Sequence, residues 1–374
     1  MEGVAQVTQV ARVAGGCDLC PRRCAVDRAS GAAGWCGAGP LPRVAHASLH
    51  FWEEPCLSGS RGSGTVFFSG CNMRCVFCQN HDISTRPGGG AALDAAALAA
   101  RMADLLGQGA HNVNLVSPSH HAPGVVAALE LLRARGASPA GGGGPTDGAG
   151  PTGGTRLAGR PTVVWNSNAY ESIESLRRLE GLVDVYLPDL KYVDDDLAVR
   201  YSSAPGYFVA ATAAIREMAR QAGPPALDDA GLIVRGVIVR HLVLPGRAAD
   251  ACRALDWVRA EFGGAVLVSV MAQYTPVHRA SEFPGLNRRV TRAEYERVLD
   301  HATAIGLEDG YFQDRGSASE QYIPPFERAP DPGGGGGTAG PGGGGGAPDP
   351  GGGGGAPDPG GGGATGAPGA RRAQ

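Results

Sequence analysis

The 374-residue chain carries a formal net charge of −3 at pH 7, which is too small to indicate a nucleic acid or an anionic membrane surface as a partner. No apolar run approaches the ~18 residues that a membrane helix needs, and residues 1–16 lack the apolar core of a signal peptide. We therefore expect a cytoplasmic protein that binds no nucleic acid and no membrane, with a weak organelle leader as the one alternative left open.

The first cysteines along the chain, Cys17, Cys20, Cys24 and Cys36, lie in a segment rich in glycine and proline that has little core of its own. Such a segment usually needs a metal to hold its shape. Four thiolates suit zinc and a second iron–sulfur cluster equally well, so both stay open, with unliganded thiols as the remaining alternative. The odd total of nine cysteines at metal-type spacings favours a reducing compartment over a disulfide framework.

A second group of thiols, Cys71, Cys75 and Cys78, has the spacing C-x3-C-x2-C and follows a short apolar run at residues 65–69. The run predicts a strand, so the three sulfurs lie on the loop that leaves its carboxyl end. A cubane cluster has four irons and structural zinc takes four protein ligands, so three thiolates leave one coordination position open. The spacing therefore indicates a reactive cluster rather than a structural metal.

This motif, with the aromatic Phe77 just before its last cysteine, resembles the signature loop of the radical S-adenosylmethionine (SAM) enzymes. Residues 50–84 resemble the subgroup related to pyruvate formate-lyase activating enzyme, and the resemblance extends over roughly residues 10–325. It implies that the three cysteines hold a [4Fe-4S] cluster whose fourth iron binds the amine and carboxylate of SAM. It further implies reductive cleavage of SAM to a 5′-deoxyadenosyl radical, which abstracts hydrogen from a substrate.

Strand-like and helix-like runs alternate through the rest of the chain. The apolar runs predict strands at 65–69, Asn112–Val116, 162–166, 183–188, 232–243 and 265–271. Helical periodicity follows each of them, beginning with Leu98, Met102 and Leu105. Six such units predict a parallel, right-handed α/β sheet. Since six units are too few for a closed eight-fold barrel, we expect a partial (β/α)6 TIM-like barrel, as the resemblance also implies.

Two glycine-rich tracts lie apart from the predicted strands and helices. Residues 136–160 interrupt the link between a helix and a strand, where a few residues normally suffice, and predict a flexible insert. The tail repeats a nine-residue unit at 342–350 and 351–359 and predicts disorder. We thus predict a Cys-rich N-terminal extension at 1–60, a barrel at 61–325 and a disordered low-complexity tail at 326–374.

Reactive groups of parallel α/β proteins gather at the carboxyl ends of the strands. Polar residues at those ends are the predicted cofactor contacts: Ser117, Ser119, His120, Asn166, Asn168, Asp189, Lys191, Arg240 and Gln273. Of these, Asp189 and Lys191 resemble the cofactor-contact segment of the activating enzymes, and Arg240 begins a segment that resembles their fifth strand. The Gly-Gly-Glu motif that usually contacts the methionine amine is missing after the second strand, so Ser117, Ser119 and His120 are its predicted substitutes.

Each of these residues also has a structural interpretation. His120 and His121 fit a zinc-binding or capping pair, and the two asparagines fit strand termination. Asp189 fits a helix N-cap, and Arg240 fits an ion pair with a nearby carboxylate. Lys191 is the only lysine in a chain that otherwise uses arginine, which favours a role for a compact ammonium, with chance survival as the alternative.

The leading functional hypothesis is a cytoplasmic radical SAM oxidoreductase, reduced by a flavodoxin- or ferredoxin-type donor. The resemblance to activating enzymes implies a protein or peptide substrate, such as a glycyl-radical partner. The alternatives are radical modification of a small metabolite and a non-catalytic zinc or iron–sulfur scaffold. The sequence does not identify the catalytic substrate contacts.

Overall fold

The computed structural model describes residues 16–85, 88–136 and 160–314. The predictions of a disordered tail at 326–374 and of a flexible insert at 136–160 fall almost wholly outside these residues. No helix in the described part of the chain is both long enough and apolar enough to cross a membrane.

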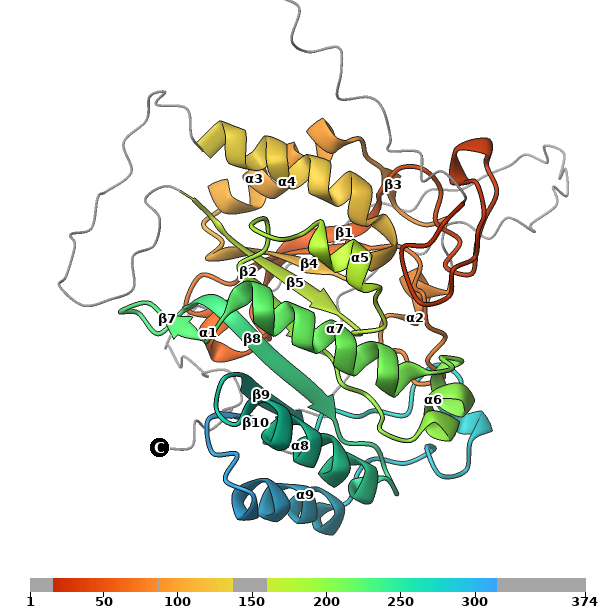
Figure 1. Ribbon diagram of the computed structural model, residues 1–374, viewed down its shortest axis with the longest axis vertical. Helices are drawn as coiled ribbons and strands as arrows, with labels where there is room; N and C mark the ends of the chain where they lie inside the picture. The colour runs from red at the N-terminus through yellow and green to blue at the C-terminus, as the bar shows by residue number, and fades with distance from the viewer. Residues whose placement is uncertain (1–15, 86–87, 137–159, 315–374) are drawn as a thin grey trace, which may run out of the picture.

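A parallel sheet forms the centre of the molecule, and its strands run side by side in the order β2, β4, β5, β6, β8, β9, β10 (Figure 1). All six predicted strands are confirmed to within two residues at either end, and β10 was not predicted. The bounds are β2 Ser63–Phe68, β4 Asn112–Val116, β5 Thr162–Ser167, β6 Val185–Pro188, β8 Ile233–Leu242, β9 Leu267–Met271 and β10 Gly310–Phe312. The α/β architecture and the partial TIM-like barrel are therefore as expected.

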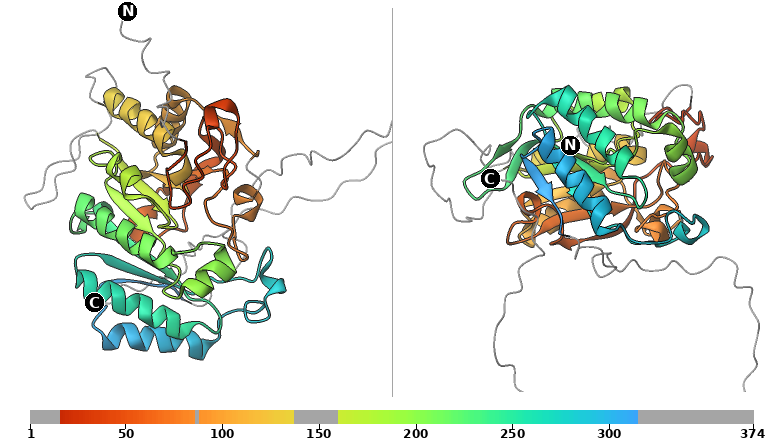
Figure 2. Two further views of the ribbon diagram at one scale, coloured as in Figure 1. Left: turned by 45° about the vertical axis from the view of Figure 1, so that its right-hand side comes forward. Right: turned by 90° about the horizontal axis from the view of Figure 1, so that it is seen from below.

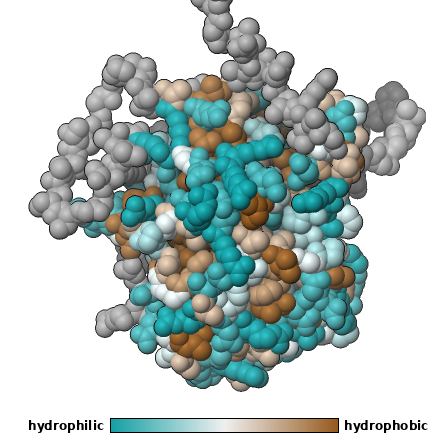
Figure 3. All heavy atoms as spheres, in the orientation of Figure 1, coloured by the Kyte–Doolittle hydropathy of each residue, from teal (hydrophilic) through white to brown (hydrophobic). Residues whose placement is uncertain are grey.

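The helices that connect these strands cover the outer side of the sheet (Figures 1 and 2). They are α3 Ala95–Gly107, α4 Ala122–Gly136, α5 Ile173–Arg177, α7 Tyr207–Ala222, α8 Ala248–Phe262 and α9 Arg292–Ala304. Their predicted apolar positions face inward, since Leu98, Met102 and Leu105 of α3 are at most 1% exposed. On the face seen in Figure 3, hydrophilic side chains lie around small hydrophobic patches.

Short elements complete the described chain. They are α2 His81–Ser84, α6 Asp195–Ser202, and the 3-10 turns η1 Arg28–Ser30, η2 Ser119–His121 and η3 Ala280–Glu282. Three antiparallel strands were also not predicted: β1 Arg43–His50 pairs with β2, β3 Ala91–Ala92 pairs with β1, and β7 Ala226–Leu227 pairs with β8. β1 is only partly buried along most of its length, so its sequence lacks the continuous apolar run by which the parallel strands were found.

The short helix α1, Pro55–Ser58, packs against the inner side of the sheet. Its Cys56 and Leu57 form a small core with Val164, Val185 and other inward-facing side chains of the strands, and Leu57 is 0% exposed. The amide of Asn112 on β4 donates to the carbonyl of Leu57 at 2.8 Å. Because α1 fills the space on the inner side of the sheet, residues 51–54, which precede it, lie on the side of the interior that faces the cysteine loop at residues 71–78.

Candidate cofactor site

The cysteine loop begins directly after β2 and is fixed in place by backbone contacts. Gly70 has φ +84°, and a Cβ there would lie 2.5 Å from the carbonyl oxygen of Cys36, so only glycine fits. Further along the loop, Arg74 N–H donates to the carbonyl of Ser202 and Val76 N–H to that of Tyr201, both at 2.9 Å. The loop is thus attached to α6 as well as to β2.

Each thiol of the loop is hydrogen-bonded to a side chain from a different part of the chain. The amide of Asn168, after β5, donates to Cys71 Sγ at 3.5 Å, and Ser202 Oγ of α6 donates to Cys75 Sγ at 3.0 Å. Ser84 Oγ of α2 lies 3.3 Å from Cys78 Sγ. Such donors orient metal-binding thiolates and stabilise their charge.

Burial raises the pKa of all three thiols, to about 12 for Cys71 and about 11 for Cys78, and the neighbouring thiol of Cys75 raises both further. Without a metal the thiols are therefore protonated at neutral pH. Binding a cluster to them releases protons, because only thiolates are ligands.

The three cysteines line a cavity of about 540 Å³ between the loop and the carboxyl ends of the strands. Its polar wall comes from several consecutive strands, as expected for a parallel α/β site. Seven predicted cofactor contacts line it: Ser117, Asn166, Asn168, Asp189, Lys191, Arg240 and Gln273. Most of the predicted cofactor contacts therefore lie on one wall of one cavity.

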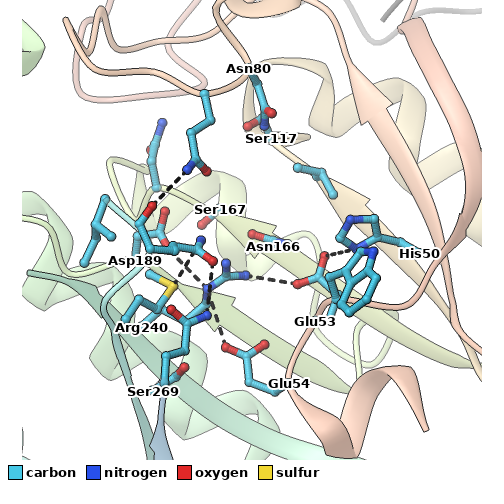
Figure 4. A pocket seen from close by; sticks show the side chains of 18 of the residues that line it. His50, Glu53, Glu54, Asn80, Ser117, Asn166, Ser167, Asp189, Arg240 and Ser269 are labelled. Carbon is cyan, nitrogen blue, oxygen red and sulfur yellow. Dashed lines mark hydrogen bonds and ion pairs between the residues drawn. The ribbon is translucent and has the colours of Figure 1, made fainter. Parts of the chain in front are cut away.

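Charged side chains form a network on the cavity wall (Figure 4). The guanidinium of Arg240 lies 3.3 Å from Glu53, 3.6 Å from Glu54 and 3.6 Å from Asp189, and Lys191 Nζ donates to Asp189 at 2.6 Å. Burial alone would lower the pKa of Arg240 and of Lys191, but the carboxylates outweigh it and raise both. Both cations therefore stay charged at neutral pH.

Three polar atoms in this network have no hydrogen-bond partner among the described residues: Glu54 Oε2, Asp189 Oδ1 and Arg240 Nε. Arg240 Nε lies 3.6 Å from Asp189 Oδ1, within ion-pair range but too far for a hydrogen bond, so a polar ligand in the cavity would complete the hydrogen bonding of these buried atoms. The N-cap interpretation of Asp189 is wrong, since it bridges to Arg240 at the end of β6, while the ion-pair interpretation of Arg240 is confirmed.

Ser119 and His120 lie outside the lining of this cavity. Ser119 Oγ donates to the buried carboxylate of Glu171, and His120 Nε2 lies 2.8 Å from the carbonyl of Ser69, with His121 Nε2 3.3 Å from the same oxygen. Burial lowers the pKa of His120 to about 4, so its ring is neutral at pH 7. These contacts support the strand end that carries the cysteine loop.

One part of the cavity was not predicted, the segment that precedes α1: His50, Phe51, Trp52, Glu53 and Glu54. The ring of His50 lies 3.5 Å from Glu53, whose pKa is lowered because His50 and Arg240 outweigh the effect of its burial. The pair of adjacent glutamates was a visible signal, but nothing in the sequence places it beside Arg240. Its position follows from the packing of α1.

The residues fit the implied cofactors. Three partly buried thiols, each with a hydrogen-bond partner, suit a cluster with an open iron, and the nearby polar atoms that lack a hydrogen bond suit the amine, carboxylate and hydroxyl groups of SAM. Among the described residues, no group of three or more His, Cys, Asp or Glu side chains stands ready to hold a single metal ion.

A partial α/β barrel with three thiols at the mouth of a polar cavity defines a cluster-dependent enzyme class. The model of the Radical SAM superfamily matches residues 65–255, and the chain belongs to that superfamily. An uncharacterized protein of Methanocaldococcus jannaschii, MJ0674, is 31% identical over 304 residues, which cover 78% of this chain and 75% of that protein.

Two solved structures are similar at low identity. SuiB of Streptococcus suis, bound to S-adenosylmethionine, is 11% identical with a TM-score of 0.41, over 65% of this chain and 48% of SuiB. The FeFe-hydrogenase maturase HydG of Carboxydothermus hydrogenoformans is 11% identical with a TM-score of 0.41, over 64% of this chain and 50% of HydG. The chain thus spans about half the length of these two proteins.

Membership of the superfamily assigns a [4Fe-4S] cluster and SAM as cofactors and radical SAM chemistry as the general activity. When bound, the two cofactors supply the reductive cleavage of a sulfonium bond and the abstraction of hydrogen. Cys71, Cys75 and Cys78 are the residues of this chain that would hold the cluster, and the charged side chains that line the cavity are fixed in place and need little reorganisation.

Proposed function

We propose that this radical SAM enzyme acts on a protein or peptide, abstracting hydrogen from a residue such as glycine in the manner of an activating enzyme. The size of the cavity carries this proposal. About 540 Å³ lies in the range of a pocket for one cofactor-sized ligand. A substrate has to share this cavity with bound SAM, which favours one that presents a small group from a larger molecule outside the cavity.

Aromatic side chains at the edge of the cavity support a macromolecular substrate. Phe51 and Trp52 line the cavity and are nevertheless 45% and 46% exposed, so they extend from it to the surface. Exposed aromatic residues beside a pocket are typical anchors for protein partners. A peptide that lies across them can insert one residue toward the cysteine loop.

Within the cavity, we assign the binding of SAM to polar groups at the carboxyl ends of β4, β5 and β6. Lys191 and Asp189 offer an ammonium and a carboxylate to its charged and hydroxyl groups, and Asn166 and Asn168 offer amides. Ser117, held at φ +56° at the end of β4, is the one predicted substitute for the Gly-Gly-Glu motif that lines the cavity, so it is our candidate for the methionine amine. A flavodoxin- or ferredoxin-type protein would supply the electron.

The deep ion-pair network favours the second candidate, a small polar metabolite. Glu53, Glu54 and Arg240 lie in the wall of the cavity, where a peptide reaching from the surface has the least access. A metabolite bound there would contact these charges directly. The two candidates therefore predict different substrates for the same radical chemistry.

The test uses the full chain with its cluster reconstituted anaerobically and reduced with dithionite. We expect methionine and 5′-deoxyadenosine to form, and a peptide containing dideuterated glycine to transfer deuterium into the 5′-deoxyadenosine. Cys75→Ala should abolish both products, whereas the matched change Cys252→Ala on α8 should leave them unaltered. Cleavage of SAM without transfer from any glycine peptide would reject the peptide proposal, and unchanged turnover by Cys75→Ala would reject the role of the loop.

A further inference from the structure

The N-terminal segment that carries Cys17, Cys20, Cys24 and Cys36 lies at the carboxyl ends of the central strands, beside α2 (Figures 1 and 2). We propose that these four thiols bind a second metal centre, either zinc or an iron–sulfur cluster, which fixes the outer side of the loop at residues 71–78. The site is separate from the cavity described above, whose lining includes none of the four.

The backbone of this segment folds so that the four cysteines converge. Ala25 N–H donates to the carbonyl of Cys17 at 3.0 Å, which brings Cys24 back beside Cys17, and Arg23 N–H donates to the carbonyl of Cys20 at 3.0 Å. Arg23 and Ala25 have φ of +41° and +54°, a conformation that side chains other than glycine adopt only at a cost. A bound metal would supply the free energy that offsets this strain.

The sulfur atoms share close neighbours. Arg28 Nη2 donates to Cys17 Sγ at 3.1 Å and to Cys36 Sγ at 3.4 Å, so one nitrogen contacts both sulfurs. Trp35 N–H donates to Cys24 Sγ at 3.5 Å.

The surrounding charges suit a metal held by four thiolates. Such a centre carries a net negative charge, and Arg28 already donates to two of the sulfurs. Three of the four cysteines, Cys17, Cys20 and Cys36, are at most 8% exposed, which shields the bound metal from competing ligands.

The segment is attached directly to the first cluster loop. Arg22 Nε donates to the carbonyl of Asn72 at 2.6 Å, and Arg74 Nη2 donates to the carbonyl of Trp35 at 2.7 Å. The carbonyl of Cys36 is the atom against which Gly70 packs. A metal at the four thiols would therefore hold three groups that touch the loop.

The test counts metal in a chain that cannot bind the first cluster, with Cys71→Ala, Cys75→Ala and Cys78→Ala combined. We expect this chain to retain about one zinc, or about four irons after anaerobic reconstitution, by mass spectrometry of metals. Adding Cys17→Ala and Cys36→Ala should remove at least four-fifths of that metal, whereas adding Cys252→Ala should remove none. A folded chain, checked by circular dichroism, that takes up neither metal would overturn the proposal.

A second measurement tests the effect on the loop. With the three loop cysteines intact, Cys20→Ala should at least halve the paramagnetic signal that shifts on addition of SAM, because the loop loses its outer support. An unchanged signal would overturn this positioning role. Failure of this inference is distinguishable from failure of the proposed function. A chain that cleaves SAM without a second metal would reject only this inference. A chain that binds the second metal but transfers no hydrogen from peptides would reject only the peptide substrate.

Discussion

Arg240 is the residue on which the charge balance of the cavity depends. It is the shared partner of three carboxylates, Glu53, Glu54 and Asp189, two of which lie in a segment far away in sequence. Removing one member of a buried ionic network leaves the others without compensation, which costs more than the network itself contributes to stability. A single substitution thus tests whether the carboxylates are as isolated from water as their burial indicates.

Arg240→Gln should lower the free energy of unfolding by about 3 kcal/mol at pH 7, because two glutamates lose their counter-charge. Thermal unfolding followed by circular dichroism measures the change. The matched control is Arg216→Gln, whose exposed pair with Glu261 should contribute less than about 1 kcal/mol. Equal effects of the two substitutions would show that the network is solvated.

Lys191 should be required for binding SAM, and its role should depend on the shape of its cation. Lys191→Met and Lys191→Arg are both expected to weaken SAM binding about tenfold, which is about 1.4 kcal/mol, since a planar guanidinium cannot replace the short ammonium contact with Asp189. Equilibrium dialysis with the reconstituted chain measures this. Arg101→Met on the exposed side of α3 is the control, and full affinity in Lys191→Arg would contradict the prediction.

Residues at strand ends were predictable because periodicity locates strands and parallel strands end at one edge. That reasoning found Asn168, Asp189 and Lys191. It could not find Glu53 and Glu54, because they precede a four-residue helix whose position depends on packing against several strands. It also grouped Ser119 and His120 with the cavity, since sequence distance from a strand end does not say which way a side chain points.

Among the secondary structure elements, α9 begins with a capping box, a sequence signal that is independent of the apolar periodicity of the helix. The side chain of Thr291 accepts a hydrogen bond from Glu294 N–H, and the carboxylate of Glu294 accepts one from Thr291 N–H. The same carboxylate also accepts hydrogen bonds from Gly246 N–H at 2.8 Å and from Arg288 at 2.6 Å. These contacts join α9 to the turn after β8. Arg288, together with the N–H donors, holds the pKa of Glu294 well below its usual range.

Glu294→Gln should destabilise the protein by about 1 kcal/mol at pH 7, or about 2 °C in Tm. Because the folded-state pKa is depressed, the contribution of Glu294 is complete above the unfolded-state value of about 4.3 and is lost as the pH falls through the folded-state value. The difference in Tm between the two proteins should therefore shrink below about pH 4. Glu296→Gln, whose pair with Arg292 lies on the same helix, is the control. A difference that does not vary with pH would contradict the ionic explanation.

The short elements were harder to predict than the long ones for a physical reason. Helices such as α7 and α8 repeat their apolar face over four turns, whereas β1 is half-exposed and β10 has three residues. Such strands form because a neighbouring strand offers hydrogen bonds, not because of their own sequence. α6 was not predicted either, although the three aspartates at its start, Asp194, Asp195 and Asp196, are a recognisable N-terminal signal.

Across the whole molecule, the cysteine loop connects parts of the barrel that are distant in sequence. It leaves β2, donates backbone hydrogen bonds to α6, and accepts one from Arg279, after β9, at the carbonyl of Val76 at 2.8 Å. The sheet between these points is continuous, but β10 and β3 lie at its two opposite ends. The loop therefore stabilises the barrel across its mouth, and a cluster that orders the loop should stabilise the entire fold.

Reconstituting the cluster should accordingly raise the Tm of the full chain by several degrees, because a ligand that binds only the folded state adds its binding free energy to stability. Anaerobic calorimetry before and after reconstitution measures the shift. In Cys71→Ala the shift should fall to whatever metal at Cys17, Cys20, Cys24 and Cys36 contributes, whereas Cys252→Ala should keep the full shift. If Cys71→Ala showed the same increase as the parent chain, the loop would be ordered by its hydrogen bonds alone. Stability and catalysis would then depend on different features of the same eleven residues between Gly70 and Asn80.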